Sequence, residues 1–309
     1  MLSRVANNLC WMGRYLERAE NTARLINVNS NLLLDLPKSI VLGWEPIVDI
    51  LSFRELYYAK HKEATERGVI TFMVADKNNA GSIVGSLSAA RENARTIREI
   101  IPREAWEQIN ELYLFAIDNC QKAVARRSRY EFLSKIIESN QMITGILAGT
   151  MTHDEGYEFL RVGRNIERAD MTTRIIDVRS ASLLQETETE QSAFENLQWM
   201  SVLKSLTAYQ MYRREMRLRI RRPDVLKFLL LEDRFPRSLL HTVQQAEQCV
   251  RTLPNHEGIV VHIKALESKL LAANPQTLIQ EKLHEFIDEM QLGLISIFDA
   301  INATYFYHE

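Results

Sequence analysis

The chain contains two similar sixteen-residue segments, at residues 13–28 and at residues 163–178. The two copies align without a gap, and nine of their sixteen positions are identical. Self-similarity at a fixed spacing indicates that a chain is built from similar structural units. We therefore expect two tandem, internally duplicated halves, residues 1–150 and 151–309, either as separate domains or around one shared core. Weaker matches occur at spacings of 155 and 156: Trp44 with Trp199, Phe72 with Phe228, and Ser82 with Ser238.

The apolar residues recur at every third or fourth position through most of the chain, and strict alternation is rare. The first pattern is typical of amphipathic helices, whereas alternation is typical of half-buried strands. The 309 residues include 11 Gly and 7 Pro, below the usual shares of about 7% and 5%, so few turns are available for a β-sandwich or a propeller. We predict an all-α helical bundle. Helices are expected at residues 4–34, 45–66, 80–100, 103–125, 129–147, 153–184, 195–220, 223–231, 235–251, 258–272 and 277–306.

The charge and cysteine content exclude several classes of protein. Basic and acidic residues number 19 and 17 in residues 1–150, and 19 and 23 in residues 151–309, so neither half attracts polyanions and no nucleic-acid partner is expected. Three widely separated cysteines favour neither a disulfide framework nor a zinc cluster, and they fit a reducing compartment. No stretch approaches the roughly 20 apolar residues of a membrane span. We expect a cytoplasmic protein with no membrane segment.

The repeated helix combines an apolar face with a compact face of arginine and acidic residues. The chain has 27 Arg and only 11 Lys, and arginine suits bidentate or partly buried pairing with carboxylates. We favour a partly buried ion-pair network that joins the halves. An exposed anion site and a solvated face with i,i+4 pairs worth about 0.3–0.5 kcal/mol remain as alternatives. The residues of this predicted network are Arg14, Glu17, Arg18, Glu20 and Arg24, with Arg164, Glu167, Arg168, Asp170 and Arg174.

Two further arginine clusters are candidates for anion or partner binding. Arg91, Arg95 and Arg98 lie at i, i+4 and i+7, where like charges repel each other unless something negative lies against them. Acidic side chains such as Asp76, Glu232 or Asp233, or a bound anion, could supply that charge. The second cluster could equally be a solvated helix end, and its candidate site residues are Arg213, Arg214, Arg217, Arg221 and Arg222.

The two Gly-Arg-x-x-Glu-Arg-Ala-(Glu/Asp) helices resemble the Glu-Arg motif of the bacterial alpha-E domain family. In this sequence the motif maps onto Glu17-Arg18 and Glu167-Arg168. Residues 90–98, 106–110 and 228–238 also resemble the family, which would make each half an alpha-E helical repeat. Family members are encoded beside, or fused to, circularly permuted ATP-grasp proteins, and often near transglutaminase-like proteins. The resemblance therefore implies an accessory protein in a system that makes or modifies an amide-linked peptide.

Motifs with a known catalytic mechanism do not occur in the sequence. It contains no P-loop, no Gly-x-Gly-x-x-Gly, no Gly-x-Ser-x-Gly and no His-Glu-x-x-His. One Glu-x-x-His occurs, at Glu281 and His284, but a di-iron site in a helical bundle requires two such motifs and two more glutamates. We expect no metal and no cofactor. A non-catalytic accessory role is favoured over an enzyme using Glu17 and Glu167, and over a phosphate or carboxylate binder using the arginine clusters.

Overall fold

The computed structural model is helical throughout the part of the chain that it describes. The residues that it describes contain fourteen α-helices and no strand, so the predicted all-α fold is confirmed. In the described part, no helix combines the length and the apolar character needed to cross a bilayer. The described residues are 1–35, 43–181, 191–216 and 219–306.

The chain divides into two compact units within helix α8 (Glu155–Ala181). The first unit comprises Met1–Glu167 together with Tyr305–Glu309, and the second comprises Arg168–Thr304. Each unit is described by itself below. This boundary between compact units is distinct from the boundary expected between the two sequence repeats, residues 1–150 and 151–309. The repeats stay a prediction.

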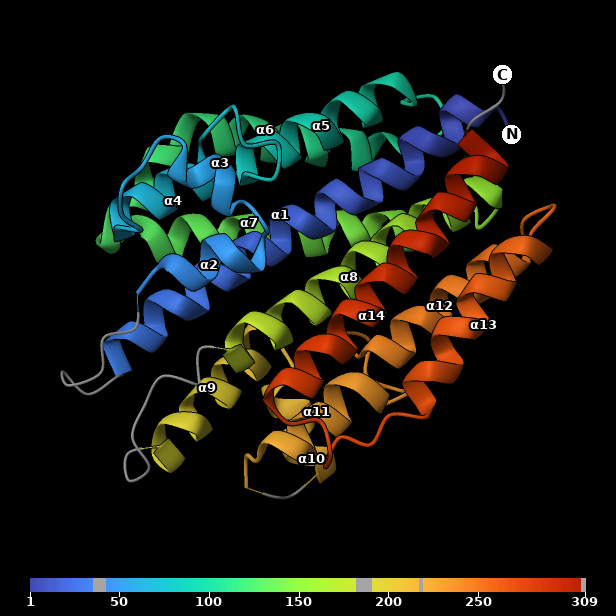
Figure 1. The fold of residues 1–309 in the computed structure, drawn as a ribbon. Coiled ribbons are helices and arrows are strands. Elements are labelled where there is room, and N and C mark those ends of the chain that lie inside the picture. The colour runs from blue at the N-terminus through green and yellow to red at the C-terminus, as the bar shows by residue number, and fades with distance from the viewer. Residues whose placement is uncertain (36–42, 182–190, 217–218, 307–309) are drawn as a thin grey trace. The chain divides into compact units, whose positions relative to one another are not determined.

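The first unit is built around a four-helix bundle (Figure 1). Helix α1 packs against α5 and α7, and α6 packs against the same two helices, which closes the bundle. Their apolar faces form a core that includes the fully buried Met12, Leu87 and Phe132. Three short helices add to this unit: α2 (Glu45–Ile50), α3 (Arg54–Tyr58) and α4 (Glu66–Val74). The bundle helices are α1 (Ser3–Asp35), α5 (Ile83–Thr96), α6 (Arg103–Val124) and α7 (Arg126–Thr150).

Where the structure describes the second unit, it contains the remainder of α8 and six further α-helices. Helix α12 packs against α11 and α13, and α13 packs against α14 (Figure 1). The core of this unit includes the fully buried Trp199, Tyr212 and Phe228. A π-helical turn, Asn302–Phe306, follows the last helix, and its residues Tyr305 and Phe306 belong to the first unit. The helices are α9 (Gln191–Ser205), α10 (Tyr209–Met216), α11 (Arg222–Leu231), α12 (Leu239–Arg251), α13 (Glu257–Leu271) and α14 (Gln280–Ile301).

Two of the expected helices are interrupted by a residue in the left-handed region. The segment expected at 45–66 breaks at Ser52, whose φ is 56°, and the segment expected at 195–220 breaks at Thr207, whose φ is 54°. At each break a backbone N–H donates to the carbonyl five residues earlier, from Phe53 at 3.1 Å and from Ala208 at 2.7 Å. This bond ends a helix in the Schellman manner. The prediction of continuous helices was wrong there because neither break carries the glycine that usually marks such a cap.

Asp154 caps the start of α8. Asp154 Oδ1 accepts hydrogen bonds from the backbone N–H groups of Gly156 at 2.9 Å and Tyr157 at 3.3 Å. These bonds satisfy donors that the first turn of a helix leaves without partners. Helix α8 therefore begins at Glu155, so Glu167 of the second Glu-Arg motif lies about three turns into the helix.

Candidate functional site

The two copies of the Gly-Arg segment lie on helices that cross at unusually close range. A Cβ placed on Gly13 of α1 would overlap the carbonyl oxygen of Leu160 on α8. A Cβ placed on Gly163 of α8 would overlap the carbonyl oxygen of Cys10 on α1. Position 163 is 150 residues after position 13, and position 160 is 150 residues after position 10. The two glycine contacts therefore occupy equivalent positions in the two copies. Only glycine allows backbones to approach this closely, which explains why each copy of the motif begins with one.

Glu167 of the second motif binds two arginines of the first. Its Oε2 accepts a hydrogen bond from Arg14 Nε at 2.9 Å. Arg18 binds the same carboxylate through two bonds, Nε to Oε1 at 2.5 Å and Nη2 to Oε2 at 2.9 Å. The side chain of Glu167 is 2% exposed, against 12% for Arg14 and 21% for Arg18. The carboxylate is therefore buried and held by two guanidinium groups at the crossing of α1 and α8.

Aromatic rings cover both arginines. The guanidinium carbon of Arg14 lies 4.7 Å from the centroid of the Trp11 ring, and that of Arg18 lies 5.5 Å from the centroid of Tyr15. A cation over an aromatic face is attracted by the ring quadrupole, and the attraction grows when water is excluded. Each guanidinium group that binds Glu167 thus also lies against an aromatic ring of its own helix.

The electrostatics of the crossing favour an ionised Glu167. Burial alone would raise the pKa of Glu167, but the nearby charges of Arg18 and Arg14 and their hydrogen bonds outweigh it and lower that pKa. The neighbouring Cys10 is fully buried, and burial raises the pKa of its thiol to about 12. A thiol with such a pKa is not a nucleophile at neutral pH, because the thiolate is the reactive form.

Three other acidic residues of the predicted network, Glu17, Glu20 and Asp170, each accept a hydrogen bond from a side chain of their own helix. Glu17 accepts a hydrogen bond from Asn21 Nδ2 at 3.2 Å. Arg24 Nε donates to Glu20 at 2.8 Å, and in the second copy Arg174 Nε donates to Asp170 at 2.8 Å. Both pairs are i,i+4 pairs on a helix face. Glu17, Glu20 and Arg24 are buried.

Arg164 and Arg168, the other two members, lie on α8 in different surroundings. Arg164 borders a cavity of about 10 Å³ together with Glu17, Glu20 and Asn140. A space of this size holds at most one water molecule. Arg168 Nη1 donates to the carbonyl oxygen of Pro236 at 3.4 Å.

Comparison with known proteins agrees with the presence of the Glu-Arg motif. The Alpha-E family model, described as a predicted alpha-helical domain with a conserved ER motif, matches residues 1–306. The chain belongs to the Alpha-E family. Two similar relatives are the uncharacterized proteins Mb2597 of Mycobacterium bovis and Rv2567 of Mycobacterium tuberculosis, both 22% identical over an alignment 342 positions long. The alignment covers 97% of this chain and 36% of each relative, so the chain spans about a third of their length. No solved structure is significantly similar to it.

The first arginine cluster of this Alpha-E chain has local partners. Arg91 Nε donates to Asn110 Oδ1 at 2.7 Å, and its guanidinium carbon lies 5.0 Å from the ring centroid of Tyr113. Arg95 binds Glu92 of its own helix through two hydrogen bonds, at 2.9 and 2.6 Å. Arg98 donates to the adjacent Glu99 at 3.3 Å.

The expected acidic partners of that cluster bind other side chains. Asp76 accepts from Lys60 at 3.2 Å, whereas Glu232 and Asp233 lie near Arg234. Helix α5 ends at Thr96. Arg98 therefore does not continue a helical ridge with Arg91 and Arg95.

The second arginine cluster lies around the break between α10 and α11. Arg213 and Arg214 are exposed on the last turn of α10, Arg221 is the residue before α11, and Arg222 begins α11. Arg217 lies outside the described residues. Arg214 lines a cavity of about 170 Å³, but so do Arg234, Glu215 and Glu232. Arg234 pairs with both glutamates, at 2.5 Å and 3.2 Å, so the charges in this cavity balance without an added anion.

A buried arginine that the sequence did not single out fixes the turn between α6 and α7. Arg129 donates to the carbonyl oxygens of Ala123 at 2.9 Å and Val124 at 3.1 Å, at the end of α6. It also pairs with Glu66 at 2.8 Å. The hydrogen bonds of Arg126, followed by those of Arg129, lower the pKa of Glu66 below its usual range. These residues border a cavity of about 140 Å³, and the only signal in the sequence is the Arg-Arg-Ser-Arg run that begins α7.

Proposed function

We propose that this Alpha-E chain is a non-catalytic accessory or scaffold protein of an ATP-grasp-type system that ligates or modifies amides or peptides. The proposal names a circularly permuted ATP-grasp protein as the partner, with a transglutaminase-like protein as a further one. The choice of partner rests on the proteins beside which members of the family are encoded, or to which they are fused.

The non-catalytic part of the proposal rests on one observation, which is that the arginines of the first motif bind a buried carboxylate of the second. Arg14 and Arg18 direct three hydrogen bonds to Glu167, whose carboxylate is almost completely buried. A general acid or base must reach the proton that it transfers, and a carboxylate enclosed between two helices does not reach a substrate. The motif therefore supports a structural role at the crossing of α1 and α8.

The lengths of the relatives also support an accessory role. In the two mycobacterial proteins the matching segment accounts for 36% of a longer chain. An Alpha-E segment can thus be covalently joined to a large further polypeptide, which is the arrangement expected of a unit that works beside other domains. Binding of a phosphate or carboxylate ligand is the alternative. The cavity that contains Arg214 does not favour it, because Glu215 and Glu232 balance the arginine charges there.

The proposal is tested by co-expressing the full chain with the circularly permuted ATP-grasp protein of the same organism. We expect the two proteins to elute as one complex in size-exclusion chromatography. We also expect the rate of ADP release by the ATP-grasp protein to change when the chain is present. Separate elution together with an unchanged rate would contradict the accessory role.

The exposed arginines provide matched variants that locate the contact surface. Reversing the charges of Arg213 and Arg214 tests the end of α10, and reversing those of Arg95 and Arg98 tests the end of α5. Both pairs are exposed, so neither double variant should affect folding. Weaker association in one double variant and normal association in the other would assign the surface.

A further inference from the structure

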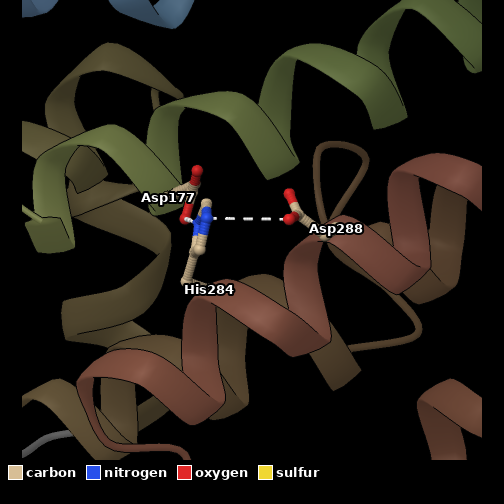
Figure 2. A group of neighbouring side chains, drawn as sticks. All are labelled: Asp177, His284 and Asp288. Carbon is tan, nitrogen blue, oxygen red and sulfur yellow. Dashed lines mark hydrogen bonds and ion pairs between the residues drawn. The ribbon is translucent and has the colours of Figure 1, made fainter.

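Three side chains with metal-ligating atoms meet between α8 and α14 in the second unit. Figure 2 shows Asp177 reaching from α8 toward His284 of α14, with Asp288 beside the same imidazole. His284 Nδ1 lies 2.8 Å from Asp177 Oδ1, and His284 Nε2 lies 3.6 Å from Asp288 Oδ2. One ligand atom from each residue lies within 4.8 Å of the other two. No motif in the sequence joins these three residues, because 107 positions separate Asp177 from His284.

The local backbone explains why the three groups converge. His284 and Asp288 are four residues apart on α14 and therefore share one helix face. Asp177 lies on the part of α8 that faces them, and its side chain is 16% exposed, against 61% for His284. The cluster is consequently anchored on one side by the body of the unit and open to solvent on the other.

The chemistry of the three groups matches a divalent first-row metal ion. Zinc binds imidazole nitrogen and carboxylate oxygen at about 2.0–2.2 Å, in tetrahedral sites that can combine three protein ligands with one open position. Imidazole also suits copper, iron and nickel, whereas magnesium and calcium favour sets of oxygen ligands alone. Two carboxylates and one neutral imidazole carry a charge of −2, which a divalent ion neutralises.

We propose that Asp177, His284 and Asp288 form a binding site for Zn²⁺ or a similar divalent transition-metal ion, and that the bound ion links α8 to α14. The fourth position is left to water or to a donor atom from a partner. This site is independent of the Glu-Arg crossing and of any ATP-grasp partner. It also differs from the di-iron type of site, since Glu281 is not part of the cluster.

Calorimetric titration of the full metal-free chain with Zn²⁺ tests the proposal. We expect one equivalent to bind and the temperature of thermal unfolding to rise with the Zn²⁺ concentration, because a ligand that binds only the folded state stabilises it. His284→Ala and Asp177→Asn should each weaken binding at least about tenfold, since losing even an outer partner of a metal ligand typically costs 10–100-fold. His284 is largely exposed, so its replacement should leave the chain folded.

His262→Ala is the matched control. His262 is also an exposed histidine, and its Nδ1 contacts Ser296 of α14 at 2.9 Å. This variant should bind Zn²⁺ as tightly as the unchanged protein. Equal affinity in the unchanged protein and in His284→Ala, or no binding at all, would overturn the proposal and leave the cluster as a histidine hydrogen-bonded to a carboxylate.

Discussion

Replacing Glu167 by glutamine should lower the free energy of unfolding by about 3–5 kcal/mol, the usual cost of removing one partner from a buried ion pair. The amide keeps the shape of the side chain but removes the charge that compensates Arg14 and Arg18. Both guanidinium groups would then remain partly buried without their carboxylate. Urea unfolding followed by circular dichroism measures the change.

The matched control for this variant is Glu92→Gln. Arg95 and Glu92 also form a two-bond pair, but both side chains are more than half exposed. Exposed pairs contribute little to stability because water and salt screen them, so this variant should change the free energy of unfolding far less. Similar losses in both variants would show that the buried crossing has no special role in stability.

The response to acid distinguishes the buried pair further. The arginines hold the pKa of Glu167 below its ordinary value of 4.5. A lowered folded-state pKa contributes stability that is present above the unfolded value and is lost as pH falls through the folded value. The unchanged protein should therefore lose more stability than Glu167→Gln on acidification below pH 4.5.

Replacing Gly163 by alanine should destabilise the protein by about 3 kcal/mol, at the upper end of the usual cost of overpacking. The added Cβ would overlap the carbonyl oxygen of Cys10. Backbone atoms on both sides of the contact leave no flexible side chain that could move away. The two helices would have to separate, and the hydrogen bonds of Glu167 would lengthen. Thermal and urea unfolding measure the loss.

Gly145→Ala is the control for Gly163→Ala. Gly145 lies inside α7, and a Cβ there would meet nothing within 4 Å. Alanine is favoured over glycine in a helix interior by about 0.5–1 kcal/mol, so this variant should be slightly stabilised. Stabilisation of both variants would contradict the close crossing.

The sequence predicted helices well wherever the three- and four-residue apolar spacing continues over a long segment and helix-starting or helix-ending residues mark both ends. The range expected at 103–125 corresponds to α6 (Arg103–Val124), and the first long helix ends within a residue of the expected position. Two of the misses, at Ser52 and Thr207, arose because each non-glycine residue takes a positive φ. At both positions a Schellman-type backbone bond ends the helix, and no glycine in the sequence marks either of them. A further miss is α4 (Glu66–Val74), which lies almost entirely between the ranges expected at 45–66 and 80–100.

For the candidate site, the sequence spacing indicated which residues pair within one helix, but not which residues of the predicted network pair across helices. The Glu20–Arg24 and Asp170–Arg174 pairs follow directly from i,i+4 spacing. The binding of Glu167 to Arg18 requires the crossing of two helices, and spacing within one helix does not reveal it. The glycines at positions 13 and 163 were the signal for that crossing, since both permit close approach.

The internal duplication stays a prediction, and several features favour it. The breaks at Ser52 and Thr207 are 155 positions apart, as are Trp44 and Trp199. Ser82 caps α5 by accepting from Gly85 and donates to the carbonyl of Asp76. At a spacing of 156, Ser238 caps α12 by accepting from His241 and donates to the carbonyl of Glu232.

The central claim is that the Glu-Arg motif holds α1 and α8 together, and a double-mutant cycle between Arg18 and Glu167 tests it most directly. The cycle compares Arg18→Met, Glu167→Gln and the double variant by their free energies of unfolding. Residues joined in one ion-pair network couple by about 0.5–3 kcal/mol, and the two bonds between these side chains predict a value near the upper end. A coupling within the roughly 0.3–0.5 kcal/mol of simple additivity would contradict the claim.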